Sequence, residues 1–413
     1  MKILVLGSGA REHAMIHALA RSPSVHKLYA CPGNDGMRGL CTSVPFTSNA
    51  DLVRFAREQV DLSVVGSSRF VEEGTVDALM TAGIPVIGPA ADAGRIETSK
   101  AFASAFLVKH NIPSPMTQVV ANRLEAERFL QENPWVKVVK CNGFSRGLGV
   151  ELVDTPDEAL AAVDRLLKKH GPPIILQERL TGVECSYSIL TDGQQWVSFS
   201  SSREYKRAGN GDTGATTGGI GSVCPFPGLT PELEERIRTR IVIPTVNGLQ
   251  ADKLIYRGFL SLHLIMTSTG PKVLEINARL GDPETQSILV RFRGNLAALL
   301  MDCALGRLDA TGSEVAFGRN SAVSVVLARA GYPNDESAEP SIQGLDELSD
   351  TQVFHSGSVW HEAERRFTFR GGRLITLSAV GETLAEARRK CYADLSRLTL
   401  RNVQYRSDIG AES

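Results

Sequence analysis

Residues 271–286 read PKVLEINARLGDPETQ, and they constrain the fold more than any other stretch of the chain. The first half alternates as a β-strand does, which places Glu275 and Asn277 on one face, two residues apart. Two oxygen ligands that point the same way suit Mg²⁺ (or Mn²⁺), which takes its remaining ligands from phosphates and water. Arg279 continues along that face and suits a carboxylate or a phosphate. A solvated edge strand would show the same pair, so the interpretation needs support from elsewhere.

Two lysines and a glycine-rich loop precede this stretch in the order that a phosphate site requires. Lys100 opens an amphipathic helix directly after Ser99, and Lys140 ends the apolar run 135–140. That run predicts a strand with an inward-pointing ammonium at its end. The loop 141–149 follows, and its backbone N–H groups can close over phosphates, although most glycine-rich loops are only turns. The glycines in question are Gly143, Gly147 and Gly149.

A candidate adenosine edge lies in the next apolar strand, residues 174–177. The strand runs into Glu178, Arg179 and Leu180, a short segment that can offer backbone groups to an adenine ring. Glu184 follows within reach of ribose hydroxyls, although taken singly it is more typical of a surface carboxylate.

Residues 202–221 read SREYKRAGNGDTGATTGGIG. This composition is too polar and too rich in glycine for a packed element, so we expect a long loop. Long loops inside compact domains are commonly functional, and a disordered linker is the alternative.

The first hundred residues alternate apolar strands with helical patterns, which predicts a parallel α/β domain. We expect strands at 3–6, 27–31, 62–66 and 85–87. Their terminal turns then line one crevice, because ligands of such sheets bind outside the carboxyl ends of the strands.

The first of these turns, Gly7-Ser8-Gly9, is a weak dinucleotide fingerprint. Its third glycine is replaced by Glu12, and no acidic residue ends the second strand, which argues against NAD or FAD. A helix N-terminus still favours a phosphate, and Arg11 adds a charge in the first turn. A small phosphorylated substrate therefore fits better than a dinucleotide.

The composition excludes several classes of protein. With 42% apolar and 22% charged residues and a net charge of -1, the 413-residue chain predicts a globular protein of several domains without an affinity for nucleic acid or for anionic membranes. Its seven cysteines are scattered and form no C-x-x-C pair, so we expect reduced thiols in the cytoplasm rather than disulfides or zinc. We expect neither a signal peptide nor a membrane span.

Taken in order, these segments resemble the ATP-grasp ligases, and within them the phosphoribosylamine–glycine ligase family. The resemblance runs from residue 1 to about residue 409. Its most specific stretches are GAREHA (9–14), PGN (32–34), SKAFA (99–103), KR (206–207), GDTG (211–214), TGG (217–219) and GDPETQ (281–286).

The resemblance implies an α/β architecture in three domains. These are an N-terminal parallel α/β domain that binds a substrate phosphate (1–99), an ATP-grasp domain (100–322) with a mobile lid (about 117–182), and a small C-terminal α/β domain (323–413). It also implies a reaction, in which ATP activates a carboxylate as an acyl phosphate that is then passed to an amine. In the family the substrates are glycine and 5-phosphoribosylamine, in purine synthesis. The expected partners are these small molecules, and the chain is expected to be a monomer or a homodimer.

The resemblance also implies a role for each matching residue. Lys100, Lys140 and the loop glycines are implied to bind the ATP phosphates, Glu275 and Asn277 the metal. Glu178, Leu180 and Glu184 are implied to contact adenosine. The implied catalytic residues are Arg279, Asp212 and Lys206. The implied substrate-binding residues are Gly9, Arg11, Glu12, His13, Gly33, Asn34, Arg69, Thr213, Gly218 and Gly219.

Several positions depart from the family pattern, mostly where the substrate is expected. Ser67-Ser68-Arg69 replaces Pro-Glu and its neighbour, Glu204-Tyr205 replaces Asp-His, His263 replaces a glycine, and Leu148 replaces a loop lysine. Three hypotheses remain open. The chain catalyses the family's own reaction, or it is a paralogue that joins another amino acid and amine in a specialised pathway, or it is a non-catalytic ATP-binding protein. The intact Glu275 and Asn277 argue against the third.

Overall fold

The fold was analysed in a computed structural model that describes residues 1–143, 149–309, 316–335, 337 and 339–411. Its N-terminal part is a five-stranded parallel sheet in the order β3-β2-β1-β4-β5. The central strand is buried on both faces, as its unbroken apolar run requires. The strands are β1 (Lys2–Gly7), β2 (Lys27–Pro32), β3 (Thr42–Ser43), β4 (Leu62–Val65) and β5 (Val86–Ile87). The accompanying helices are α1 (Ala10–Ala20), η1 (Asp35–Met37), α2 (Asn49–Gln59), α3 (Arg69–Glu72), α4 (Thr75–Thr81) and α5 (Ala91–Thr98). The predicted parallel α/β domain is confirmed.

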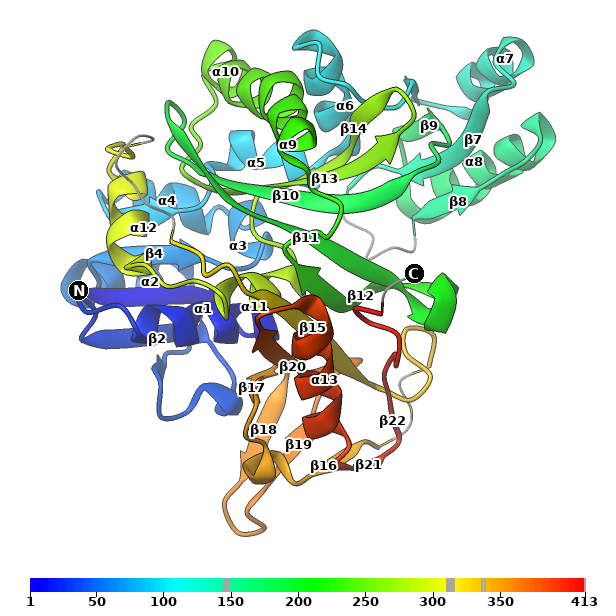
Figure 1. The fold of residues 1–413 in the computed structure, drawn as a ribbon. Helices are drawn as coiled ribbons and strands as arrows, with labels where there is room; N and C mark the ends of the chain where they lie inside the picture. The colour runs from blue at the N-terminus through cyan, green and yellow to red at the C-terminus, as the bar shows by residue number, and fades with distance from the viewer. Residues whose placement is uncertain (144–148, 310–315, 336, 338, 412–413) are drawn as a thin grey trace.

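A nine-stranded sheet, antiparallel along the path that follows, forms the body of the molecule (Figure 1). Its path is β14-β13-β10-β11-β12-β15-β20-β17, and β22 pairs with β15. The sheet runs without a break from the middle of the sequence into the C-terminal region, through the pairing of β12 with β15. Its strands are β10 (Val183–Thr191), β11 (Trp196–Gly209), β12 (Thr213–Cys224), β13 (Gly258–Thr267), β14 (Gly270–Asn277), β15 (Ser321–Arg329), β17 (Thr351–His355), β20 (Arg373–Gly381) and β22 (Val403–Gln404).

The prediction of a long loop over residues 202–221 is wrong. These residues form most of a β-hairpin, in which β11 and β12 pair antiparallel around the turn η2 (Asn210–Asp212). Composition misled the prediction because the sheet pairs the backbone whatever the side chains are, and because Tyr205 and Ile220 supply the buried apolar contacts. The register shifts twice along the hairpin, which accommodates the glycines.

A separate four-stranded sheet, β6-β9-β7-β8, projects from the body at the upper right of Figure 1. The helices that lie with it bury an apolar cluster of their own against it, which includes Val139, Leu166 and Leu176. The elements of this region are α6 (Lys100–Lys109), β6 (Thr117–Val120), α7 (Arg123–Glu132), β7 (Val136–Cys141), β8 (Val150–Leu152), α8 (Pro156–His170) and β9 (Ile174–Glu178).

Helix α11 (Glu284–Leu289) lies at the centre of the molecule, where it packs against α1, β11, β12 and β15 (Figure 1). All six of its residues are buried. The remaining elements are α9 (Pro231–Ile237), the π-helical η3 (Arg238–Val242), α10 (Ile243–Ala251), α12 (Leu296–Ala304), β16 (Ser341–Gln343), η4 (Leu345–Glu347), β18 (Ser358–His361), β19 (Arg366–Phe369), α13 (Leu384–Leu395) and β21 (Thr399–Arg401). Among the residues described, no helix combines the length and the apolar character needed to cross a membrane.

Arg406 fastens the tip of the β11–β12 hairpin to the C-terminal tail. Its guanidinium is almost fully buried, with 1% of the side chain exposed, and it donates to Asp212 at 2.6 Å and to both carboxylate oxygens of Asp408 at 2.6 and 2.7 Å. It also donates to the carbonyl oxygen of Arg207 at 3.1 Å. A buried guanidinium with this many acceptors fixes two distant segments of the chain against each other.

We predict that Arg406→Met, which keeps the apolar volume but removes every donor, lowers the free energy of unfolding by about 1–3 kcal/mol. Urea unfolding of the purified variant measures this. Arg366→Met is the matched control, because the Arg366–Glu364 pair is exposed and should contribute little. Equal urea midpoints for the two variants would contradict the role given to Arg406.

Candidate active site

Lys206 in β11 lies at the centre of a group of carboxylates. Its Nζ is 3.3 Å from Glu184 Oε2, 3.9 Å from Glu204 Oε2 and 3.9 Å from Glu275 Oε1. The four side chains come from β10, β11 and β14, which the sheet brings together although they are far apart in sequence. Burial disfavours the ammonium, but Glu275, Glu204 and Glu184 outweigh that cost and raise the pKa of Lys206. The structure thus brings together Lys206, Glu184 and Glu275.

Glu275 and Asn277 have the donor set that a hard divalent cation prefers. Burial alone would raise the pKa of Glu275, but Lys206, followed by His263 and the two lysines Lys140 and Lys100, lowers it to about 2. The carboxylate is therefore ionised at any pH near neutrality. With the amide oxygen of Asn277 two residues on in the same strand, it offers the oxygen ligands that Mg²⁺ takes together with nucleotide phosphates.

Lys140 and Lys100 supply the positive charge beside this pair. Burial is the largest influence on Lys140 and lowers its pKa to about 8, while Glu275 opposes the shift and Lys100 and Lys206 add to it. Lys100 Nζ donates to the carbonyl oxygen of Gly143, which ties the start of the glycine-rich loop to α6. Two lysines near one carboxylate form a site with an affinity for anions such as phosphates.

The glycine-rich loop is anchored at its first residues. Asn142 Oδ1 accepts hydrogen bonds from Ser99 Oγ at 3.2 Å and from the backbone N–H of Ala101 at 3.1 Å. Gly143 adopts a positive φ of 82°, and the carbonyl oxygen of Gly149 accepts from the N–H of Cys141 at 2.9 Å. Gly147, the remaining glycine predicted to bind phosphate, lies outside the described residues.

The three residues predicted to contact adenosine have different surroundings in the structure. Glu178 Oε1 accepts from the N–H of Met116 at 2.9 Å and from Lys272 Nζ at 3.1 Å, so it joins the small sheet to β14. Leu180 is half-buried just beyond β9. Glu184, by contrast, is directed to Lys206.

Arg279 is held by a residue that the sequence did not reveal. Its Nη2 forms an ion pair with Glu97 Oε1 at 2.9 Å, and Glu97 is buried at the end of α5 with 4% of its side chain exposed. Glu97 also accepts from Ser68 Oγ at 2.8 Å and from the N–H of Ala278 at 2.9 Å. Arg279 further donates to Asn277 Oδ1 at 3.4 Å. No local pattern around Glu97 could have predicted this, because its partners lie in distant segments.

Arg373 is a second residue that sequence reasoning missed. It starts β20 in the C-terminal region, and its guanidinium donates to the carbonyl oxygens of Gly218 at 2.6 Å and Asp282 at 2.7 Å, and to the Asp282 carboxylate at 2.9 Å. Gly219, at a positive φ of 101°, passes so close that a Cβ there would lie 2.7 Å from Glu204 Oε1. The C-terminal region therefore fixes the Gly218–Gly219 segment beside the carboxylates.

The N-terminal turns are largely occupied by internal hydrogen bonds. Glu12 accepts from the N–H of Gly9 at 2.6 Å and from Arg11 Nε at 2.8 Å, and Gly33 donates to the carbonyl oxygen of Gly7 at 3.1 Å. Glu12 thus takes one of the N–H groups that a phosphate would use. Arg11 carries a positive charge in this region. Burial would lower the pKa of its guanidinium, but the carboxylates of Glu12, Asp282 and Glu97 outweigh burial and raise that pKa.

His13 and Asn34 join this region to the C-terminal part of the chain. His13 Nδ1 accepts from the backbone N–H of His355 at 3.0 Å, and Asn34 Nδ2 donates to the carbonyl oxygens of Ser8 at 2.6 Å and His355 at 3.0 Å. Burial, with a smaller contribution from His355, lowers the pKa of His13 to about 3, so the imidazole is neutral.

Arg69, Asp212 and Thr213 are among the predicted residues that the structure does not bring to the carboxylate group. Arg69 is 75% exposed and pairs with Glu73 at 2.6 Å along α3. Asp212 and Thr213 lie at the hairpin tip, where Asp212 binds Arg406 and Thr213 Oγ1 donates to the carbonyl oxygen of Asn210 at 2.9 Å. From the turn after β4 it is Ser68, not Arg69, that points inward.

Comparison with known proteins finds one family over nearly the whole chain. Residues 1–97 match the N domain of phosphoribosylglycinamide synthetase, residues 98–285 its ATP-grasp (A) domain, and residues 322–412 its C domain. The phosphoribosylamine–glycine ligase of Salmonella typhimurium is 37% identical over 99% of this chain and 98% of its own length. That of Escherichia coli strain K12 is 36% identical over the same shares.

Solved structures give the same assignment. The phosphoribosylamine–glycine ligase of Thermotoga maritima superimposes with a TM-score of 0.85 at 29% identity, covering 99% of this chain and all of the other. The biotin carboxylase domain of Hydrogenobacter thermophilus 2-oxoglutarate carboxylase, solved with MgADP, has a TM-score of 0.73 at 14% identity over 98% of this chain and 91% of that one, which establishes a shared fold only. Fold and site therefore define an ATP-grasp protein. The chain belongs to the phosphoribosylglycinamide synthetase family of ligases.

We predict that Ser68→Ala lowers kcat/KM of the ligase reaction by up to about tenfold, because a hydrogen bond to a buried carboxylate contributes about 1.5 kcal/mol and Glu97 positions Arg279. Steady-state kinetics measures this. Arg69→Ala is the adjacent control and should leave kcat/KM unchanged, since its side chain is solvated. A loss of kcat/KM in Arg69→Ala but not in Ser68→Ala would show that Arg69, and not Ser68, contributes to the site.

Proposed function

We propose that this chain catalyses the ATP-dependent joining of glycine to 5-phosphoribosylamine, giving glycinamide ribonucleotide, ADP and phosphate in purine synthesis. The observation that carries the proposal is the ionised Glu275, paired with Asn277 in β14 and surrounded by the ammonium groups of Lys206, Lys140 and Lys100. This arrangement suits the transfer of a phosphoryl group between two anions. The family relationship over the whole length supports the particular substrates.

The residues have the following tasks in this proposal. Glu275 and Asn277 would hold Mg²⁺, which would neutralise phosphate charge. Lys140 and Lys100 bind the ATP phosphates, and Arg279, fixed by Glu97, orients the carboxylate of the amino acid for attack on the γ-phosphorus. Positioning two reactants in this way can lower the barrier by several kcal/mol. Water must be kept from the acyl phosphate until the amine attacks.

The altered segments gave the reason to consider a different substrate. The segment around Arg69 gives little support to a different substrate, because the Arg69 side chain is exposed and paired with Glu73. In the other, Glu204-Tyr205, the tyrosine is buried and Glu204 lies beside the proposed metal ligands, 3.9 Å from Lys206 Nζ. We place the reaction in the cytoplasm, where ATP is available and where the seven unpaired cysteines remain reduced.

The proposal is tested by measuring ADP release with Mg-ATP, glycine and freshly generated 5-phosphoribosylamine, with the product identified by mass. We expect amine-dependent ADP and glycinamide ribonucleotide. Glu275→Gln should lower kcat/KM by roughly 100-fold or more, because a metal's charge stabilisation is worth several kcal/mol. If product forms only with another amine, the enzyme has a different substrate from the one proposed. Full activity of Glu275→Gln would show that Glu275 does not belong to the active site.

We also predict an alkaline limit set by Lys140. Since its pKa in the free enzyme lies at about 8, the ammonium is present below that pH and is lost above it. Therefore kcat/KM for ATP should fall as the pH rises through about 8. Lys140→Arg, which stays charged, should move the fall to higher pH. If the fall occurs at the same pH in this variant, another group is responsible.

A further inference from the structure

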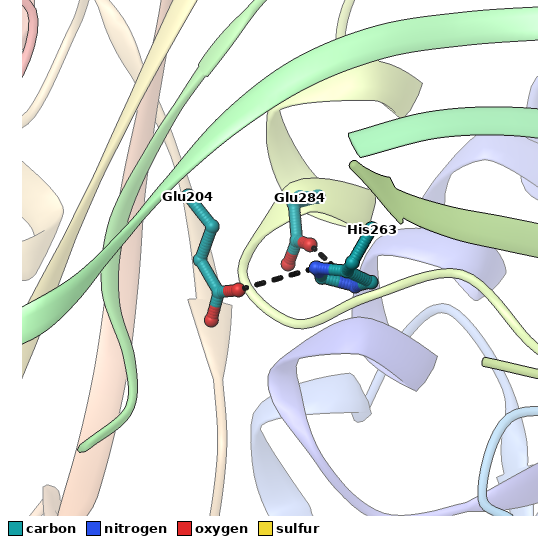
Figure 2. A group of neighbouring side chains, drawn as sticks. All are labelled: Glu204, His263 and Glu284. Atoms are coloured by element: carbon teal, nitrogen blue, oxygen red, sulfur yellow. Dashed lines mark ion pairs between the residues drawn. The ribbon is translucent and has the colours of Figure 1, made fainter. Parts of the chain in front are cut away.

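A second group of side chains lies directly beside the Lys206 cluster. Glu204 of β11, His263 of β13 and Glu284 of α11 point toward one another (Figure 2). His263 Nδ1 is 3.9 Å from Glu204 Oε2, and His263 Nε2 is 3.7 Å from Glu284 Oε1. One ligand atom from each residue can be chosen so that all lie within 4.8 Å of one another.

Two polar atoms of this group are buried without a partner. His263 is 6% exposed and Glu284 is 1% exposed, and neither His263 Nε2 nor Glu284 Oε2 has a hydrogen-bond partner in the part of the chain that the structure describes. The only hydrogen bond described for the Glu284 carboxylate comes from Ser186 Oγ at 3.3 Å, and that hydroxyl is equally far from His263 Nδ1. Leaving buried groups unsatisfied costs about 1–3 kcal/mol each, so a group that binds both is favoured.

The charges around these three side chains also favour a bound cation. Lys206 is shared by Glu184, Glu204 and Glu275, so it does not neutralise Glu204 by itself. Among the described residues, His263 is the only basic side chain paired with Glu284. The buried Glu284 and the half-buried Glu204 thus share one imidazole and one lysine that is also paired with two other carboxylates.

We propose that Glu204, His263 and Glu284 bind one divalent transition-metal ion of the Zn²⁺ or Mn²⁺ class. Each ligand atom sits about 2.0–2.2 Å from such an ion. Only one of the two imidazole nitrogens can bind it, so the three ligand atoms, which lie within 4.8 Å of one another, move closer together when they share the ion. The imidazole ligand favours a transition metal over Mg²⁺, which prefers oxygen. The bound ion satisfies the unpartnered atoms and ties β11, β13 and α11 together.

This site is distinct from the pair that holds the nucleotide's metal. It uses none of the atoms of Asn277, and although Glu275 Oε1 is 3.9 Å from His263 Nδ1, Glu275 is directed to Lys206 as well. Its ion therefore binds without ATP.

The test is Co²⁺ and Zn²⁺ binding to the metal-stripped full-length protein in the absence of nucleotide. We expect one ion per chain, with a visible Co²⁺ absorption spectrum that Zn²⁺ abolishes by competition. His263→Gln and Glu204→Gln should weaken binding by more than the roughly 10- to 100-fold that loss of an outer-shell partner costs. Asn277→Ala and the surface variant His361→Gln should bind as the unaltered chain does.

Several outcomes would overturn the proposal. These are the absence of stoichiometric binding without nucleotide, equal affinity in His263→Gln, or loss of binding in Asn277→Ala, which would assign the ion to the nucleotide site. Far-ultraviolet circular dichroism checks that each variant is folded. If His263→Gln does not fold, the metal affinity of Glu204→Gln tests the proposal instead. In that case the proposal also requires that Zn²⁺, but not Mg²⁺, raises the melting temperature of the unaltered protein.

Discussion

The shared ion pair of Lys206 with Glu184, Glu204 and Glu275 is the constraint on which the site depends. A partly buried ammonium is stabilised when carboxylates surround it, and here they come from β10, β11 and β14 of one sheet. In return the lysine keeps Glu275 ionised, with its pKa at about 2. The register of the nine-stranded sheet therefore sets the charge on the residue that is proposed to hold the metal.

The C-terminal region completes this arrangement rather than merely packing beside it. Arg373 bonds to both Gly218 and Asp282, Arg406 secures the hairpin tip, and His355 binds His13 through its backbone. Each contact joins segments more than ninety residues apart in sequence. The site is consequently a product of the whole chain, which agrees with a family relationship that extends over all three regions.

Much of this could be predicted from the sequence, and the failures have physical causes. The parallel N-terminal sheet, the helix that Lys100 opens and the strand carrying Glu275 and Asn277 all follow from local periodicity, and all are present. The hairpin at 202–221 was missed because backbone pairing with β15 stabilises a sequence that no local rule would favour. Glu97 and Arg373 were missed because their partners are remote, and Arg69 was overrated because a change of residue type does not reveal where a side chain points.

The central claim is that a carboxylate is activated by phosphoryl transfer in the site around Glu275 and Lys206. The most direct measurement follows oxygen from the amino acid into phosphate. Glycine labelled with ¹⁸O in its carboxylate is turned over with ATP and 5-phosphoribosylamine, and the released phosphate is analysed by mass. Acyl phosphate chemistry predicts that one labelled oxygen appears in each phosphate, because the attacking carboxylate oxygen stays on phosphorus when the amine displaces it. Phosphate without label, formed at the same rate as the amide, would contradict the account.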